Sequence, residues 1–171
     1  MIINFEIVKI DSEYCDYLRG FDARVTYNKN EKSLRPFLGA LIEINNCKYF
    51  APLSSPKPKH EKMKNIIDFI KIDGGKLGAI NFNNMIPVKE NNYVLVDLNT
   101  KLSSRDDIIY QNLLKEQLRW LNKNKSSILK ASNKLYFSYV NNSLSINIRN
   151  RCCNFLLLEE KCNLYNINNN I

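Results

Sequence analysis

The first residues of the chain alternate between apolar and polar positions and then change to helical spacing. Residues 2–10 read IINFEIVKI, an alternation that predicts a β-strand. Asp11 or Ser12 can then cap a helix. Its apolar residues, at helical spacing, are Tyr14, Leu18 and Phe21. We therefore expect the fold to open with a strand followed by a short helix.

Two hairpins are predicted in the middle of the chain. In the first, the turn Asn45-Asn46 joins the apolar run 37–44 to the run 47–53. In the second, Asp73-Gly74-Gly75 separates two runs, of which IIDFI alone would also fit a helix; the turn favours strands. Residues 54–65, SSPKPKHEKMKN, are expected to form a basic loop, and YVLVDL at 93–98 a further strand.

The C-terminal part of the chain has helical spacing. Ser103 or Ser104 can cap a long helix. Its apolar stripe is Tyr110, Leu114, Leu118 and Leu121. A second helix is predicted from about 126 to 139, with Ile128, Leu135 and Tyr139 inward, and a third at 154–167. Without a repeat or a linker, residues 1–171 are expected to form one α+β domain in which 166–171 fray.

Charge changes this picture by pointing to an anionic partner. The 171 residues carry a formal net charge of +8. A basic chain is more often a partner of nucleic acid or anionic lipid than a neutral one. The chain is also rich in Asn, Ile and Lys, as an AT-rich genome would encode, so we give the charge half its usual weight.

Cysteine usage and apolar runs indicate a reduced, cytoplasmic protein. The five cysteines form no CxxC pair, and one histidine cannot complete the usual zinc ligand sets with them, so we expect buried thiols. No run approaches the ~20 apolar residues of a membrane span, and no basic segment precedes an apolar one at the N-terminus. We expect no metal, no cofactor and no membrane partner.

The segment 52–60 is the strongest candidate for chemistry. Ser54 and Ser55 can donate hydrogen bonds to phosphate oxygens, Lys57 supplies positive charge, and alternating prolines restrict the backbone. His60 is the one side chain here whose ordinary pKa of ~6.5 suits proton transfer at neutral pH. The more frequent role of such a string is nevertheless structural, with hydroxyls capping turn backbone and lysines in solvent.

Other motifs are absent or weak. GGKLG lacks the spacing of a phosphate-binding P-loop, and no HExxH motif or paired aspartate cluster exists. Cys47 lies within a strand pattern, where a cysteine is more often core than nucleophile. These observations disfavour metal-dependent nuclease chemistry.

At several separated places the chain resembles the ToxN/AbiQ endoribonuclease toxins of type III toxin-antitoxin and phage-exclusion systems. The matching stretches are YLRGFDARV, RPFLGALIEINNCKYFAPLSSPK, KLGAINFNNMIPV and CNFLLLEEKC, in that order. The resemblance implies a strongly twisted antiparallel sheet flanked by helices, similar to the Kid and MazF toxin ribonucleases.

The resemblance also implies site residues. The family motif Pro-Leu-(Thr or Ser)-Ser-x-Lys falls on residues 52–57, so that Ser54, Ser55 and Lys57, with His60, are the expected catalytic residues. Arg35, with Lys32 nearby, stands where some members have a lysine, and Tyr27 is the nearest aromatic of the preceding loop. We expect Tyr27, Lys32 and Arg35 to bind RNA. Two lysines that follow the motif, Lys59 and Lys62, are expected to bind RNA with them.

The implied function is metal-independent RNA cleavage to 2',3'-cyclic phosphate and 5'-hydroxyl ends. The implied partner is an antitoxin RNA of tandem pseudoknot repeats, which the toxin processes and which closes with it into a ring assembly. Two alternatives stay open from the residues alone: a non-catalytic RNA-binding module, and an interaction domain whose lysines reflect codon usage. Only an enzyme would leave defined RNA ends, and the interaction domain would bind nucleic acid weakly and indifferently, so that an absence of salt-dependent RNA affinity would favour it.

Overall fold

The computed structural model describes residues 4–27 and 35–168 of the chain. Its strands are β1 (Glu6–Ile10), β2 (Pro36–Gly39), β3 (Glu43–Ile44), β4 (Cys47–Ser54), β5 (Phe69–Lys71), β6 (Ala79–Asn81), β7 (Ile86–Val88) and β8 (Tyr93–Leu95). They form an antiparallel sheet in the order β5-β6-β4-β2-β1-β8, and β3 and β7 also pair with β4.

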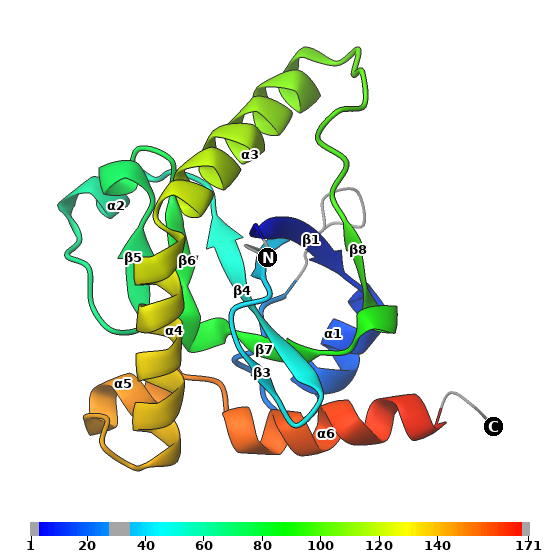
Figure 1. Ribbon diagram of the computed structural model, residues 1–171, viewed down its shortest axis with the longest axis vertical. Helices are drawn as coiled ribbons and strands as arrows, with labels where there is room; N and C mark the ends of the chain where they lie inside the picture. The colour runs from blue at the N-terminus through cyan, green and yellow to red at the C-terminus, as the bar shows by residue number, and fades with distance from the viewer. Residues whose placement is uncertain (1–3, 28–34, 169–171) are drawn as a thin grey trace.

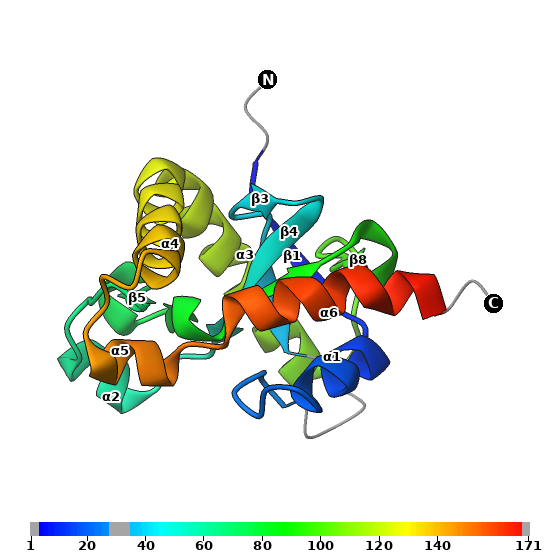
Figure 2. The same ribbon diagram turned by 90° about the horizontal axis from the view of Figure 1, so that it is seen from below.

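Helices lie around this sheet. They are α1 (Ser12–Arg19), α2 (Pro58–Lys62), α3 (Arg105–Lys123), α4 (Lys125–Val140), α5 (Ile146–Arg151) and α6 (Phe155–Asn168). In both views α6 lies beside β7 and α1, while α3 passes over the end of the sheet where β4 stops (Figures 1 and 2). The predicted α+β class, an antiparallel sheet flanked by helices, is confirmed; the likeness to Kid and MazF stays a prediction.

Strand β4 is the centre of the sheet. Pro52 faces Phe37 of β2, Lys48 faces Val88 of β7, and Leu53 faces Ile80 of β6. Because neighbours pair along both of its edges, β4 is buried over most of its length, and only Lys48 near its start and Ser54 at its end are partly exposed. The polar residues that follow β4 therefore begin at the edge of the sheet, where solvent can reach them.

Two local signals act as the sequence predicts. The Asp11 carboxylate caps α1 by accepting a hydrogen bond of 2.9 Å from the backbone N–H of Tyr14. Asn45 and Asn46 adopt φ of 51° and 63°, which matches the tight turn favoured between antiparallel strands, and they join β3 to β4. The second hairpin, β5 with β6, is also confirmed.

Several element boundaries differ from the sequence prediction. The run 37–44 is divided into β2 and β3, β1 begins at Glu6, and β8 ends at Leu95. The expected basic loop contains α2, and α5 was not predicted. Helix α6 extends to Asn168, beyond the point where we expected fraying to begin; 169–171 lie outside the described residues. The single-domain organisation stays a prediction.

Three buried polar side chains of the core form one hydrogen-bonded group, whereas the buried His60 Nδ1 and Gln117 Oε1 atoms have no hydrogen-bond partner among the described residues. All five cysteines are free and buried, as predicted. The hydroxyls of Tyr49 and Tyr136 each donate a 2.6 Å hydrogen bond to the buried carboxylate of Glu159. These contacts connect β4 and α4 to α6.

Membrane-spanning helices and metal-binding clusters are both absent from the described ranges, 4–27 and 35–168. No helix there is long and apolar enough to cross a membrane. No group of three or more His, Cys, Asp or Glu side chains in these ranges is arranged to hold a metal ion.

Candidate active site at the end of strand β4

The candidate site lies where β4 ends and α2 begins. Ser54 is the last residue of β4 and faces Ala79 of β6, whereas Ser55 lies outside the sheet and is exposed. Lys57 is the N-cap residue of α2, and Pro58 occupies the first helical position, where a proline's fixed φ suits a helix start. The two hydroxyls and the Lys57 ammonium thus come from one short segment held between a strand and a helix.

Ser54 is held by contacts from two other elements. The Nδ2 amide of Asn81 in β6 donates a 2.7 Å hydrogen bond to the Ser54 hydroxyl oxygen. From α3, the buried Gln117 Nε2 donates to the carbonyl of Leu77 at 2.7 Å and lies 3.4 Å from the carbonyl of Ser54. A Cβ at Gly78 would lie 1.9 Å from that carbonyl oxygen, so only glycine fits there.

His60 is enclosed beside this segment. Its side chain is 3% exposed, and its ring centroid lies 5.8 Å from that of Phe69. Burial lowers the pKa of His60, and the positive charges of Lys57 and Lys59 lower it further. A Cβ on Gly75 would lie 2.7 Å from the His60 carbonyl carbon, so the turn before β6 packs directly against α2. The imidazole is therefore neutral and closed to solvent at pH 7.

Lys59 and Lys62, both predicted to bind RNA, extend from α2 into solvent. Together with Lys57 they place three ammonium groups around one short helix. Of the three, Lys57 is nearest to Ser55 along the chain, two residues away.

Arg35 approaches the same end of β4 from the neighbouring strand. Strand β2 pairs antiparallel with β4, with Phe37 opposite Pro52, so Arg35, just before β2, lies towards the end of β4 that carries Ser54. Desolvation raises the pKa of the Tyr110 phenol on α3, and the nearby charge of Arg35 opposes this rise. The end of β4 is thus adjoined by Arg35 as well as by the α2 lysines.

The other predicted RNA-binding residues are not placed at this cluster. Tyr27 is exposed, and the Arg19 guanidinium lies 4.8 Å from the centre of its ring, at the end of α1. Lys32 lies outside the described residues. The prediction that they bind RNA stays a prediction.

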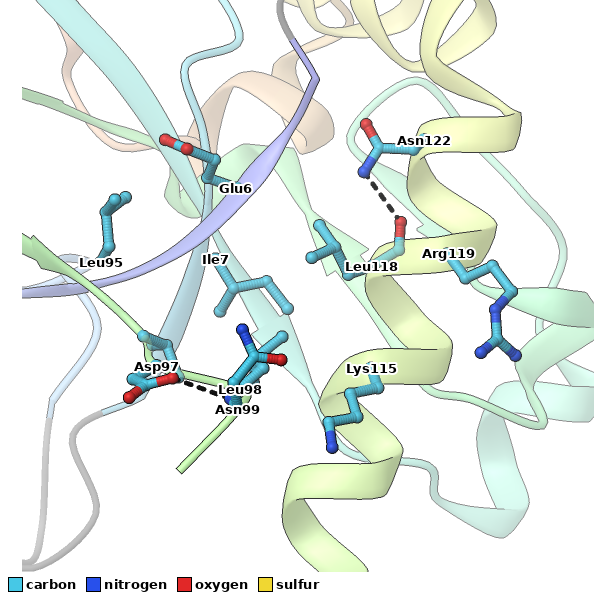
Figure 3. A pocket seen from close by; sticks show the side chains of 11 residues that line it. Glu6, Ile7, Leu95, Asp97, Leu98, Asn99, Lys115, Leu118, Arg119 and Asn122 are labelled. Atoms are coloured by element: carbon cyan, nitrogen blue, oxygen red, sulfur yellow. Dashed lines mark hydrogen bonds between the residues drawn. The ribbon is translucent and has the colours of Figure 1, made fainter. Parts of the chain in front are cut away.

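A cavity of about 700 Å³ lies on the side of α3 that faces β1 and the segment after β8 (Figure 3). Ile7 and Leu118 point towards one another across it, and Lys115 and Asn122 also line it from α3. Arg119 points away from its middle. Its lining combines apolar residues with the acidic side chains of Glu6 and Asp97.

Sequence analysis missed Asn81, Gln117 and Tyr110 as neighbours of the site. Gln117 carried a signal, since it interrupts the apolar stripe of α3 between Leu114 and Leu121, and a polar residue in such a place needs buried partners. Tyr110 was expected on the inward stripe and is instead 36% exposed, because the first turns of α3 extend beyond the sheet.

The arrangement is suited to binding and polarising a phosphodiester. Hydroxyls on a fixed backbone can donate to non-bridging phosphate oxygens, and flanking cations stabilise the charge that develops when the phosphorus becomes five-coordinate. The backbone of Ser54 is already held by pairing with β6 and by the Gln117 amide of α3, so little ordering is needed when a substrate arrives.

The chain is similar in sequence to known endoribonuclease toxins. A family model described as toxin ToxN of type III toxin-antitoxin systems matches residues 6–163. The endoribonuclease ToxN of Bacillus thuringiensis subsp. kurstaki is 33% identical over 160 residues, which cover 91% of this chain and 81% of that protein.

Two solved structures share the fold over nearly the whole chain. One concerns selective toxin inhibition by a non-coding RNA pseudoknot in bacterial type III toxin-antitoxin systems; it aligns with a TM-score of 0.81 and 33% identity, covering 96% of this chain and 99% of that one. The other concerns a bacterial antiviral system regulated by a processed non-coding RNA, with a TM-score of 0.77, 30% identity and coverage of 92% and 97%.

Proposed function

The chain belongs to the ToxN family of type III toxin-antitoxin systems, and on that premise we propose that it is a sequence-specific endoribonuclease toxin. Its substrate is cellular or phage RNA, and its site of action is the cytoplasm. The observation that carries this proposal is the position of Ser54, Ser55 and Lys57 at the partly exposed end of β4, towards which Arg35 lies at the start of the neighbouring strand. These are the positions on which the family's active-site motif falls.

The proposed reaction is a metal-independent transesterification. The ribose 2'-oxygen attacks the adjacent phosphorus and loses its proton, and the bond to the 5'-oxygen breaks as that oxygen gains a proton. A 2',3'-cyclic phosphate and a 5'-hydroxyl end result, and no atom of the protein is covalently modified. Ser54 and Ser55 donate to the non-bridging oxygens, while Lys57 and Arg35 stabilise the five-coordinate phosphorus.

Proton transfer is assigned first to Lys57. Lys57 is exposed beside the two hydroxyls, whereas the His60 imidazole is enclosed against Phe69 and would have to move to reach a substrate. Tyr27 stacks against Arg19 at the end of α1 and would have to move from there to transfer a proton to the substrate. His60 and Tyr27 remain the other candidates for the second proton.

We further propose that a tandem-repeat pseudoknot RNA is both a substrate and the inhibitor of the protein, in a closed toxin-RNA assembly. Two observations support this. The related structures concern toxin inhibition by an RNA pseudoknot and regulation by a processed non-coding RNA. The formal charge of +8 favours binding to a folded RNA, and release from that RNA during phage infection would account for an antiviral role.

The test is incubation of purified wild type, Lys57→Ala and Lys130→Ala with total RNA in excess EDTA, followed by mapping and chemical typing of new ends. Lys130→Ala is a matched control, since this exposed lysine lies on α4 and carries the same charge. We expect cyclic-phosphate ends at recurring sequences for wild type and Lys130→Ala only. Intact RNA in all three samples would contradict the proposal and favour a non-catalytic RNA-binding module.

A further inference from the structure

We propose that Asn81 is a positioning residue that directs the proton of the Ser54 hydroxyl towards the scissile phosphate. The inference deepens the proposed ribonuclease function and rests on it. Its starting point is the 2.7 Å hydrogen bond in which the Asn81 amide donates to the Ser54 hydroxyl oxygen.

The direction of this hydrogen bond determines what the serine can still do. A serine hydroxyl has one proton to donate and two lone pairs to accept with. Because Asn81 donates, one lone pair of Ser54 is occupied and its own proton is not used. Within residues 4–27 and 35–168, no side chain or carbonyl accepts that proton. The hydroxyl therefore remains a donor for an incoming phosphate oxygen.

The sheet explains why Asn81 reaches Ser54. Ser54 faces Ala79 across the β4–β6 pair, and residues two apart in a strand point to the same face. Asn81 is therefore the diagonal neighbour of Ser54 on that face, within reach of an amide side chain. Pairing of Asn81 with Phe69 of β5 holds its backbone from the other edge.

The backbone of Ser54 is held by further contacts. Its carbonyl is in close contact with Gly78 and lies 3.4 Å from the Gln117 amide of α3. With the peptide held by β6 and α3, the Asn81 amide needs to select only the rotation of the hydroxyl. Donors that are oriented before the substrate binds are the ones that lower an activation barrier.

The decisive variant is Asn81→Asp. A carboxylate of the same shape offers only acceptors, so it takes the Ser54 proton and turns the hydroxyl away from the substrate. We expect kcat for RNA cleavage to fall about 10²-fold, as when one transition-state donor is removed, with KM and the melting temperature nearly unchanged.

The matched control is Asn84→Asp. Asn84 lies three residues further along and donates a 2.8 Å hydrogen bond to the Arg24 carbonyl, so its substitution loses a comparable bond and adds the same charge. This variant is expected to cleave at the wild-type rate. An equal loss of kcat in both variants would overturn the proposal, because added charge or altered folding would then explain it.

A double-mutant cycle with Ser54→Ala separates positioning from a general structural role. If Asn81 acts through the Ser54 hydroxyl, adding Asn81→Asp to Ser54→Ala lowers the single-turnover rate less than two-fold further. If the two losses multiply, Asn81 acts independently and the proposal is wrong. Failure of the wild type to cleave would instead refute the proposed function itself.

Discussion

The two ends of β4 place reactive side chains in opposite surroundings. At the first residue, the Cys47 thiol is buried and its Sγ lies 3.3 Å from the Sγ of Cys162 on α6. The hydrogen bond to Cys162, together with burial, raises the pKa of Cys47 far above its usual value. At the last residue, Ser54 reaches the surface beside the exposed Ser55 and the lysines of α2.

The difference shows that a reactive side-chain type does not by itself define a site. Cys47 is intrinsically the better nucleophile, but its thiol is kept protonated and closed to solvent, which makes it part of the packing. Ser54 and Ser55 are poor nucleophiles, yet they lie on fixed backbone next to positive charge and open to a large substrate. We call the Cys47 end of β4 the closed end and the Ser54 end the open end. We therefore expect changes at the closed end to affect stability and changes at the open end to affect cleavage.

The largest effect that tests this contrast is expected from Ser55→Ala. Loss of an exposed hydroxyl removes a donor from the developing charge on phosphorus, so cleavage should fall by ~10²-fold or more and toxicity on induced expression should be lost. The melting temperature should stay within about 1 °C of wild type, because no hydrogen bond or packing of the folded protein is lost.

Cys47→Ala tests the other end of β4. It should lower the melting temperature while leaving cleavage per folded molecule unchanged. Full toxicity of Ser55→Ala, or loss of cleavage by a folded Cys47→Ala protein, would refute the division between the two ends.

The next largest effect is expected from Gly78→Ala, which should lower both the stability of the protein and cleavage at the open end of β4. The added methyl group would meet the Ser54 carbonyl, and φ at this residue is +104°, so the free energy of unfolding should fall by about 3 kcal/mol or more. Chemical denaturation measures this, and cleavage by the remaining folded protein should also fall because the Ser54 peptide moves.

Gly74→Ala is the matched control for that substitution. Gly74 also has a positive φ, of +65°, but nothing lies within 4 Å of the added methyl, so only about 1 kcal/mol should be lost and cleavage should be retained. Equal destabilisation by the two variants would mean that close contact with Ser54 contributes nothing.

A smaller effect is expected from Tyr136→Phe, which changes a buried hydrogen bond away from the open end of β4. This change removes one of the two hydroxyls that donate to Glu159 and should lower the free energy of unfolding by about 1–3 kcal/mol, with cleavage by the folded protein unchanged. Tyr139→Phe serves as control, since Tyr139 is buried on the same helix and its hydroxyl has no hydrogen-bond partner among the described residues. Equal losses in both variants would show that the Glu159 contact is not stabilising.

The smallest effect concerns pH. The folded protein holds the pKa of His60 below the usual ~6.5, through burial first and then Lys57 and Lys59. Between the pKa of His60 in the folded protein and ~6.5, the unfolded chain therefore binds a proton that the folded protein does not. The free energy of unfolding falls as the pH falls through this range, and above pH ~6.5 His60 causes no loss of stability. The melting temperature between pH 7.5 and 5.5 should fall more for wild type than for His60→Gln; parallel curves would contradict this.

Local patterns predicted much of the fold, because the interactions they reflect are local. The cap at Asp11, the turn at Asn45-Asn46 and the stripe Leu114–Leu121 each depend on residues a few positions apart. The division of 37–44 into two strands and the exposure of Tyr110 depend instead on which elements pack together, and spacing along the chain carries no information on that.

The candidate site was predictable in one part only. Ser54, Ser55 and Lys57 are neighbours in sequence, so the motif reveals them together. Asn81 and Gln117 reach Ser54 through strand pairing and helix packing over separations of 27 and 63 residues. His60 was predicted to transfer protons, but packing against Phe69 and the turn at Gly75 encloses it.

The spread of these contacts along the chain has a practical consequence for genetics and protein engineering. The segment 97–104 is almost entirely exposed and joins β8 to α3, so it is a natural place to divide the gene into two coding pieces. The first piece would carry Ser54, Lys57 and Asn81, while Gln117 would come from the second. Neither piece alone would be toxic, and growth arrest would report reassembly of the two inside one cell.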